Sequence, residues 1–177
     1  MYRTGYGPAD RDRRPAPPGR GGTRPPSPPG FRRDQPAGLP ANYLAGGYFD
    51  ENGNLRLELV SDLAQEVAKE IRSAPLRRRE PMAYSQLRSF WSITQGIRNR
   101  LLAQDSFSAV KADIQMLSTR AANAVSREVV PPVFKEFIDS NVALALRSAK
   151  DFQKGFVPHF EAVVAFYYSL EHQDKAR

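Results

Sequence analysis

Two pairs of arginines are the residues of this sequence whose type and spacing could do chemistry. Arg88 and Arg98 fall in one amphipathic stretch, and Arg120 and Arg127 fall in the next. A guanidinium group is planar and can donate two parallel hydrogen bonds to one phosphate. The pairs therefore favour a binding site for phosphate groups, although the 16 acidic residues after position 40 could pair with the same arginines instead.

The other reactive side chains form no catalytic pattern. The chain has no cysteine and two histidines, His159 and His172, which are not spaced as a helical metal-binding pair. Glu161 stands alone in an apolar run, and there is neither a Walker-type phosphate loop nor a Gly-x-Ser-x-Gly elbow. We therefore expect a protein that is not an enzyme and that needs no metal or cofactor.

The first 40 residues differ in composition from the rest of the chain. They hold eight Arg, no Lys, three Asp and 10 of the 15 prolines, and so carry +5 of the net charge of +7. Such a segment buries too little apolar surface to offset an ordering entropy of about 1–2 kcal/mol per residue. The composition predicts a disordered basic tail over 1–42 and a folded domain over 43–177. The tail also contains one Arg-Gly-Gly at 20–22, a unit that could contact nucleic acid. Its proline-rich run at 24–29 resembles a ligand for a groove domain.

Apolar residues at helical spacing predict an all-α bundle of about five helices in the folded domain. The expected helices cover about 61–73, 84–103, 107–127, 132–149 and 151–171. Asn52-Gly53 favours a short hairpin or turn at the N-terminal side, since both residues tolerate a positive φ. One hairpin without partner strands cannot make a β domain, so this turn does not change the all-α prediction. Asn141 falls on the buried side of its helix and needs a hydrogen-bond partner there. Because of Gly155 and Pro158, the sequence does not determine the conformation of the first turns of the last helix.

Helical geometry places the arginines beside the buried stripes. The expected stripe of the 84–103 helix consists of Leu87, Phe90, Trp91, Thr94, Ile97 and Leu101. Arg88, Gln95 and Arg98 follow one flank of this stripe. Arg120 and Arg127 are seven residues apart and so share a flank of the 107–127 helix. In such positions the stem packs on apolar surface while the guanidinium reaches into solvent.

Several segments, in order, resemble the small subunit of type III-A (Csm-type) CRISPR effector complexes. They are Tyr48-Phe49-Asp50 through Gly53-Asn54-Leu55-Arg56, Ser85-Gln86-Leu87-Arg88-Ser89-Phe90, the helix end at Arg127, Phe134 to Ile138, and the segment from Asp151-Phe152 to Phe166. The resemblance covers about 47–170. Asn123, Ser126 and Phe166 depart from it, because the family usually has an aromatic residue, a glycine and a tyrosine there.

The resemblance implies a noncatalytic helical subunit, present in several copies, that stacks along the guide RNA–target RNA duplex and holds the target strand. Its partners would be the target and guide RNA, other copies of itself, and the backbone and large subunits, which carry the chemistry. Arg88 and Arg127 match family arginines by position, whereas Arg98 and Arg120 come from helix geometry alone.

Two other functions stay open at this point. One is the small subunit of the related Cmr-type complex. The other is a helical adaptor that binds a protein partner through its aromatic last helix or its proline-rich tail. The chain has no apolar run of about 18 residues or more that could span a membrane. No secretory signal pattern opens the sequence, so we expect a cytoplasmic protein.

Overall fold

A computed structural model of the chain describes residues 38–76 and 80–175. These residues belong to one compact unit, Gln35–Arg177. The predicted tail, apart from residues 38–42, lies outside the described residues, as does the arginine run at 77–79. Within the described part, Leu39 already packs against the core, and turns begin at Ala41. The domain boundary at 42 stays a prediction.

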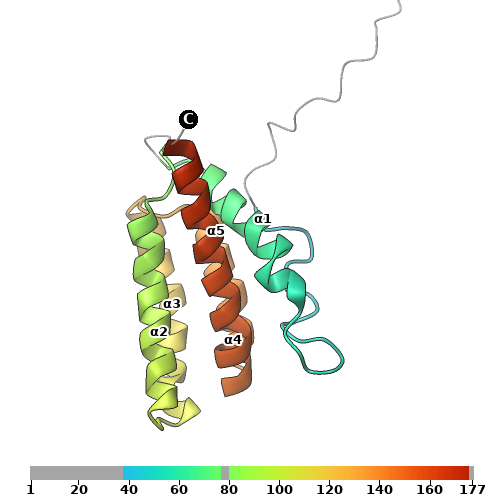
Figure 1. The fold of residues 1–177 in the computed structure, drawn as a ribbon. Coiled ribbons are helices and arrows are strands. Elements are labelled where there is room, and N and C mark those ends of the chain that lie inside the picture. The colour runs from blue at the N-terminus through green and yellow to red at the C-terminus, as the bar shows by residue number, and fades with distance from the viewer. Residues whose placement is uncertain (1–37, 77–79, 176–177) are drawn as a thin grey trace, which may run out of the picture. The chain divides into compact units, whose positions relative to one another are not determined.

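Five α-helices form the described part of the chain, with two short helical segments of other types (Figure 1). The elements are η1 (Leu57–Val60, a 3₁₀ helix), α1 (Asp62–Ser73), α2 (Tyr84–Leu102), α3 (Phe107–Ser126), α4 (Pro132–Ala145), η2 (Asp151–Phe156, a π-helix) and α5 (Val157–Lys175). Among the described residues there is no strand, only an isolated antiparallel bridge between Phe49 and Leu55. The predicted all-α fold is confirmed.

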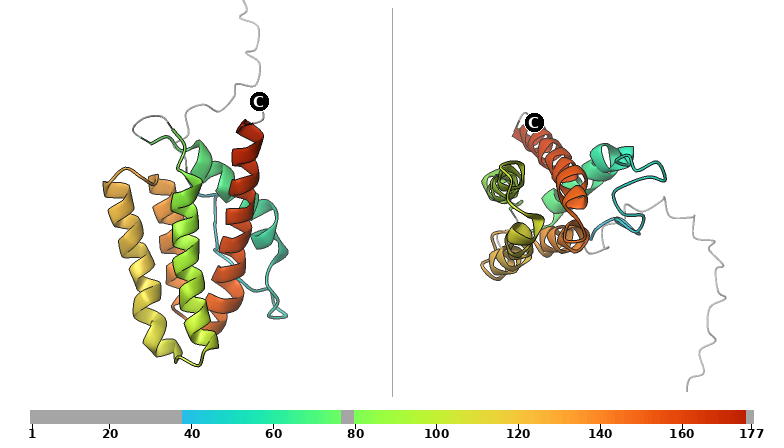
Figure 2. Two further views of the ribbon diagram at one scale, coloured as in Figure 1. Left: turned by 60° about the vertical axis from the view of Figure 1, so that its left-hand side comes forward. Right: turned by 90° about the horizontal axis from the view of Figure 1, so that it is seen from below.

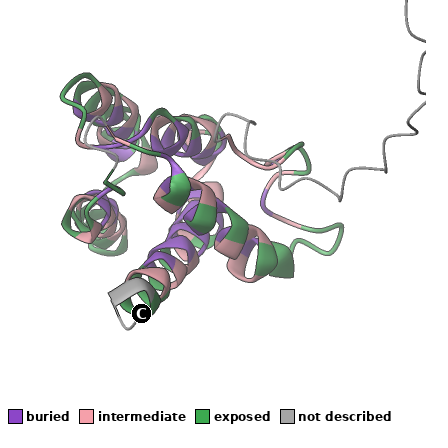
Figure 3. Ribbon diagram, turned by 90° about the horizontal axis from the view of Figure 1, so that it is seen from above, coloured by how far each residue is buried: buried purple, intermediate pink, exposed green. Residues whose placement is uncertain are grey.

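Helices α2 to α5 form a ring in which each helix packs on the next (Figure 2). Helix α3 packs on α2 and α4, η2 connects α4 to α5, and α5 closes the ring against α2. Helix α1 packs mainly on the outer side of α5. Figure 3 shows the buried residues of these helices facing one another, with the exposed residues pointing outward. Helix α5 packs on α1, α2, η1 and η2, and is thus the central helix of the described part.

The predicted turn at Asn52-Gly53 is present. Gly53 has a φ of +77°, a conformation that glycine adopts without steric cost. The Asp50 carboxylate accepts hydrogen bonds from the backbone N–H groups of Asn52 at 2.9 Å and Asn54 at 2.8 Å. Just before the turn, Tyr48 is buried, so this segment closes one side of the core.

The predicted end of the fourth helix at 149 is wrong, because α4 ends at Ala145. Ahead of η2, a helical turn begins at Ala149, and the hydroxyl of Ser148 accepts a hydrogen bond from the backbone N–H of Asp151 at 3.0 Å, so Ser148 stands at the N-cap position of this turn. The spacing of Ser148 and Asp151 is a capping-box pattern that the apolar periodicity hides.

A π-helical turn, η2, opens the last helical segment. Phe152, Gly155 and Phe156 in this turn are buried. The ring of Tyr48 lies directly against Gly155, since a Cβ atom there would stand 2.4 Å from Cδ2 of Tyr48. Glycine is therefore required at this position by close packing. The turn joins the N-terminal segment to the core of the bundle.

Candidate nucleic-acid interface

One arginine of α2 is held by carboxylates. Nε of Arg100 lies 2.8 Å from Oδ2 of Asp105, and its Nη1 also contacts Asp113. Hydrogen bonds to Asp105 and then to Asp113 raise the pKa of Arg100. Because Asp113 belongs to α3, Arg100 ties the end of α2 to the neighbouring helix and takes a structural role.

The four predicted site residues differ in exposure and in hydrogen bonding. Arg88, Arg120 and Arg127 are exposed, and none of the three forms an ion pair or a side-chain hydrogen bond within the described ranges. Arg98 is half-buried, and its Nη1 lies 3.5 Å from Oε1 of Gln95, at the limit of a hydrogen bond. Within the described part of the chain, these arginines therefore do not make the carboxylate pairing that the sequence left open.

Aromatic contacts show which side of α2 faces α5. The ring of Tyr84 lies 5.1 Å from that of Tyr168, and the ring of Trp91 lies 5.5 Å from that of Phe160. Arg88 lies about 40° from Tyr84 and about 60° from Trp91 around the helix axis. Arg98 lies about 20° from Trp91. Arg88 and Arg98 are thus on the side of α2 that faces α5, which we call the α5 flank.

The other pair lies on the opposite side of α2. Asp113, Arg120 and Arg127 are spaced by seven residues on α3, so each is turned by only about 20° from the one before. Asp113 contacts Arg100 of α2, so Arg120 and Arg127 follow the side of α3 that faces α2. The structure therefore does not gather the four arginines into one cluster. It places one pair on each side of α2.

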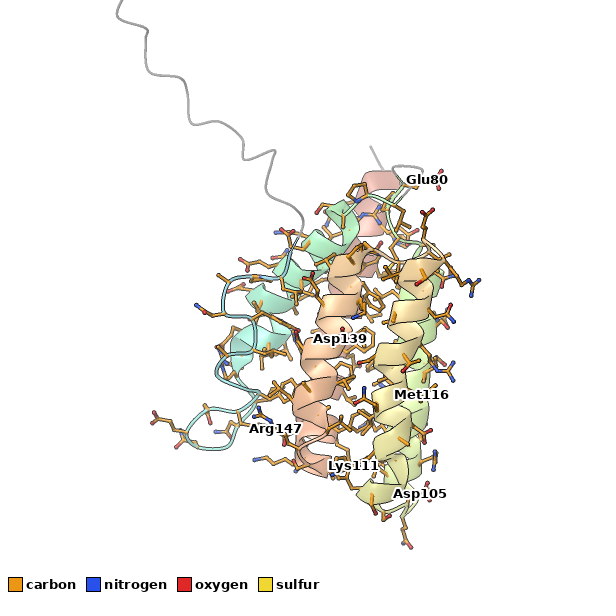
Figure 4. The ribbon with its side chains drawn as sticks, turned by 180° about the vertical axis from the view of Figure 1, so that it is seen from behind. Glu80, Asp105, Lys111, Met116, Asp139 and Arg147 are labelled. Carbon is orange, nitrogen blue, oxygen red and sulfur yellow. The ribbon has the colours of Figure 1, made fainter. Side chains whose placement is uncertain are left out.

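The arginines also differ in their height along the bundle. A short loop joins α2 to α3, with Asp105 at that end of the bundle and Glu80 at the opposite end (Figure 4). Arg88 and Arg120 are almost equally far from this loop along the chain, and Arg127 lies beyond them. Arg98 lies about 15 Å from Arg88 along α2, toward the loop. Arg88, Arg120 and Arg127 therefore share one half of the bundle.

Between the two arginine pairs, the outward side of α2 carries small uncharged residues. They are Ser85, Ser89, Ser92, Gly96 and Asn99, and all are exposed. A Cβ atom at Gly96 would meet no other atom within 4 Å. Packing within the bundle therefore does not explain a glycine in the middle of this helix. Sequence reasoning missed this surface, although its spacing of four and three residues was visible.

The family model for Csm2 Type III-A matches residues 54–173 of the chain. The chain belongs to this family. No curated protein and no solved structure gives a significant match. The family match makes the protein a small subunit of a type III-A CRISPR complex, as the resemblance of its motifs predicted. The matched range includes all five α-helices up to residue 173 and all four predicted arginines.

Another motif arginine of this Csm2-family chain has a structural role. The Nη1 group of Arg56 donates to the carbonyl of Gly47 at 3.0 Å, and its Nε donates to Glu58 at 2.8 Å. Arg56 thereby holds the loop before the Gly53 turn against η1. Arg56 and Arg100 are thus bound to carboxylates, and this separates them from Arg88, Arg120 and Arg127.

A buried polar network explains Asn141 and His159. The Asn141 amide donates to the Tyr43 hydroxyl at 2.7 Å and to the Phe137 carbonyl at 2.8 Å, while its Oδ1 accepts from Tyr48 at 2.9 Å. The predicted need for a partner at Asn141 is confirmed. Burial lowers the pKa of His159 to about 4, so the ring is neutral near pH 7. His159 lies in the core, within this network.

The described helices and acidic side chains also bear on a membrane span and on a metal site. No helix among residues 38–76 and 80–175 is long and apolar enough to cross a membrane. In the same part of the chain, no three His, Asp or Glu side chains gather in a way that could hold a metal ion.

Proposed function

We propose that this protein is a noncatalytic, RNA-binding structural subunit of a type III-A CRISPR-Cas interference complex. It stacks along the guide RNA–target RNA duplex and holds the target strand for antiviral defense. The observation that carries the proposal is the division of the arginines, because Arg56 and Arg100 are bound to carboxylates whereas Arg88, Arg120 and Arg127 are exposed without such partners in the described part.

Exposed, unpaired guanidinium groups are suited to phosphate. A bound phosphate releases counterions and gains two hydrogen bonds without first breaking an ion pair in the protein. The small uncharged side of α2 lets an RNA backbone approach the helix closely, with an arginine pair on each side. Such contacts carry no sequence information, so base pairing with the guide selects the target.

Repeated copies make weak contacts sufficient. The part of the chain after residue 40 has a net charge of only +2, so a single copy offers few phosphate contacts. Several copies along one duplex add their contacts within one assembly. The partners in this proposal are the guide and target RNA, other copies of the chain, and the backbone and large subunits. The complex acts in the cytoplasm, and this subunit needs no cofactor.

The proposal is tested by reversing two charges. In the full-length chain, Arg88→Glu with Arg127→Glu is expected to weaken binding of a single-stranded RNA, measured by fluorescence anisotropy across a salt series. Each lost phosphate contact should reduce the magnitude of the salt slope by about 0.7. Arg147→Glu with Lys154→Glu is the matched control, because it makes the same change in charge at two other exposed positions.

Two results would overturn the proposed site. One is wild-type affinity and slope in a double variant whose circular dichroism shows a folded bundle. The other is an equal loss in the control variant. Copurification separates the proposal from the adaptor: a guide-length RNA with several unlike subunits supports the complex, and a single protein partner without RNA supports the adaptor. The family match is to the type III-A branch, so the Cmr-type alternative is not proposed.

A further inference from the structure

Three aromatic rings lie against one another on the surface where α2 meets α5. The ring centroid of Tyr168 is 5.1 Å from that of Tyr84 and 4.0 Å from that of His172. Tyr168 is 46% exposed, His172 is exposed, and Tyr84 is half-buried. We call these three residues the aromatic patch.

Tyr167 and Tyr168 are adjacent on α5 but differ in their contacts. Tyr167 is fully buried, and its hydroxyl donates to the carbonyl of Met82, which anchors α5 to the segment before α2. The Tyr168 hydroxyl makes no hydrogen bond within residues 38–76 and 80–175. Tyr168 thus presents part of its ring to solvent, while the rings of Tyr84 and His172 contact it and hold its orientation.

The aromatic patch lies beside one of the exposed arginines. Arg88 follows Tyr84 by one helical turn, about 6 Å along the axis and about 40° around it. Both residues are on the α5 flank of α2. An aromatic ring on which a base can stack, next to a guanidinium that donates hydrogen bonds to a phosphate, is the combination that binds single-stranded nucleic acid. A base in a duplex is stacked on both faces, so the patch suits an unpaired base.

We propose that the exposed part of the Tyr168 ring stacks on an unpaired nucleobase of the bound RNA while Arg88 contacts the neighbouring phosphate. Tyr84 and His172 position the ring. Every base has an aromatic face, so the contact is independent of sequence. This inference rests on the proposed RNA-binding function, and it adds a stacking contact to the phosphate contacts described above.

The test uses oligouridine that contains a single 2-aminopurine, because the fluorescence of this base is quenched on stacking. The full-length Tyr168→Ala variant is expected to bind roughly tenfold more weakly than the wild type, since one stacked base contributes on this order. Its salt slope should not change, and its quenching should be lost. Tyr168→Phe keeps the ring and should behave as the wild type. An oligonucleotide of the same length without bases should bind the wild type and Tyr168→Ala equally.

The control is Leu57→Ala, which removes an exposed apolar side chain, 78%, from η1. It should leave both affinity and quenching unchanged. Wild-type affinity and quenching in Tyr168→Ala would overturn the stacking contact, even where the Arg88 and Arg127 variant still lowers the salt slope and so supports RNA binding. Equal losses in Tyr168→Ala and Tyr168→Phe would also overturn it.

Two further outcomes count against the inference. Loss of a copurifying protein from Tyr168→Ala, with RNA binding intact, would assign the patch to a protein partner and overturn the stacking contact. A wild-type chain that binds no RNA at all would overturn the proposed function and the stacking contact together.

Discussion

The hydroxyl of Tyr43 lies 2.6 Å from Nε2 of His159, a residue 116 positions further along the chain. On its other side, Nδ1 of His159 contacts the carbonyl of Leu59. A carbonyl can only accept, so Nδ1 carries the proton, and the Tyr43 hydroxyl donates to Nε2. A neutral histidine in the core thereby ties the segment before α1 to α5.

This arrangement makes the stability of the fold depend on pH. Burial lowers the pKa of His159 from 6.5 to about 4, so between these values the unfolded chain binds a proton that the folded chain does not. The contribution is fully present above pH 6.5 and is lost as the pH falls toward 4. It amounts to about 3 kcal/mol at most. The free energy of unfolding, measured with urea from pH 7.5 to 4, should fall more steeply in the wild type than in His159→Gln. Parallel curves for the two proteins would contradict this assignment.

Removing the hydroxyl that links Asn141 and His159 should destabilise the bundle. Tyr43→Phe leaves the Nε2 atom of His159 without its donor and one Asn141 N–H without its acceptor. An unpaired buried polar group costs about 1–3 kcal/mol. The matched control is Tyr168→Phe. The hydroxyl of Tyr168 makes no hydrogen bond in the described part, so its removal should not change the free energy of unfolding. Equal stabilities of the two variants in urea unfolding would argue against the network.

Two glycine-to-alanine changes should have opposite effects. Gly155→Ala places a Cβ atom against the ring of Tyr48 and should lower the free energy of unfolding by about 1–3 kcal/mol, because the core must shift. Gly96→Ala meets open space and should raise the free energy of unfolding by about 0.5–1 kcal/mol, since alanine favours the helix. Thermal unfolding of both variants checks the pair, and a stabilised Gly155→Ala would contradict the contact with Tyr48.

A larger side chain at position 96 tests the close approach of RNA to α2. Gly96→Gln adds no charge and leaves the bundle intact, yet it should weaken RNA binding because it fills the uncharged side between the two arginine pairs. Anisotropy with single-stranded RNA measures the effect. Ala143→Gln at an exposed position of α4 introduces the same side chain elsewhere, also without a change of charge. Unchanged affinity in Gly96→Gln would place the RNA away from this side of the helix.

Much of the fold follows from local patterns in the chain. The apolar spacing around Leu87 and Val110 predicts α2 and α3 almost to their ends, and the turn at Gly53 follows from its dipeptide. The end of α4 does not follow from apolar spacing, because the capping hydroxyl of Ser148 decides it. The partners of His159 could not be predicted, since they come from segments about a hundred positions away in the chain.

The sequence by itself determines the five helices, the order of the family motifs and the positions of Arg88, Arg98, Arg120 and Arg127 beside the buried stripes. Only the tertiary structure decides which arginines are free, because an ion pair such as that of Arg100 and Asp113 depends on which helix packs alongside. The same packing places the two arginine pairs on opposite sides of α2 and brings Tyr168 to Tyr84 beside Arg88. Helical periodicity is a local property of the chain, whereas the neighbours of each helix flank are set by contacts between distant segments.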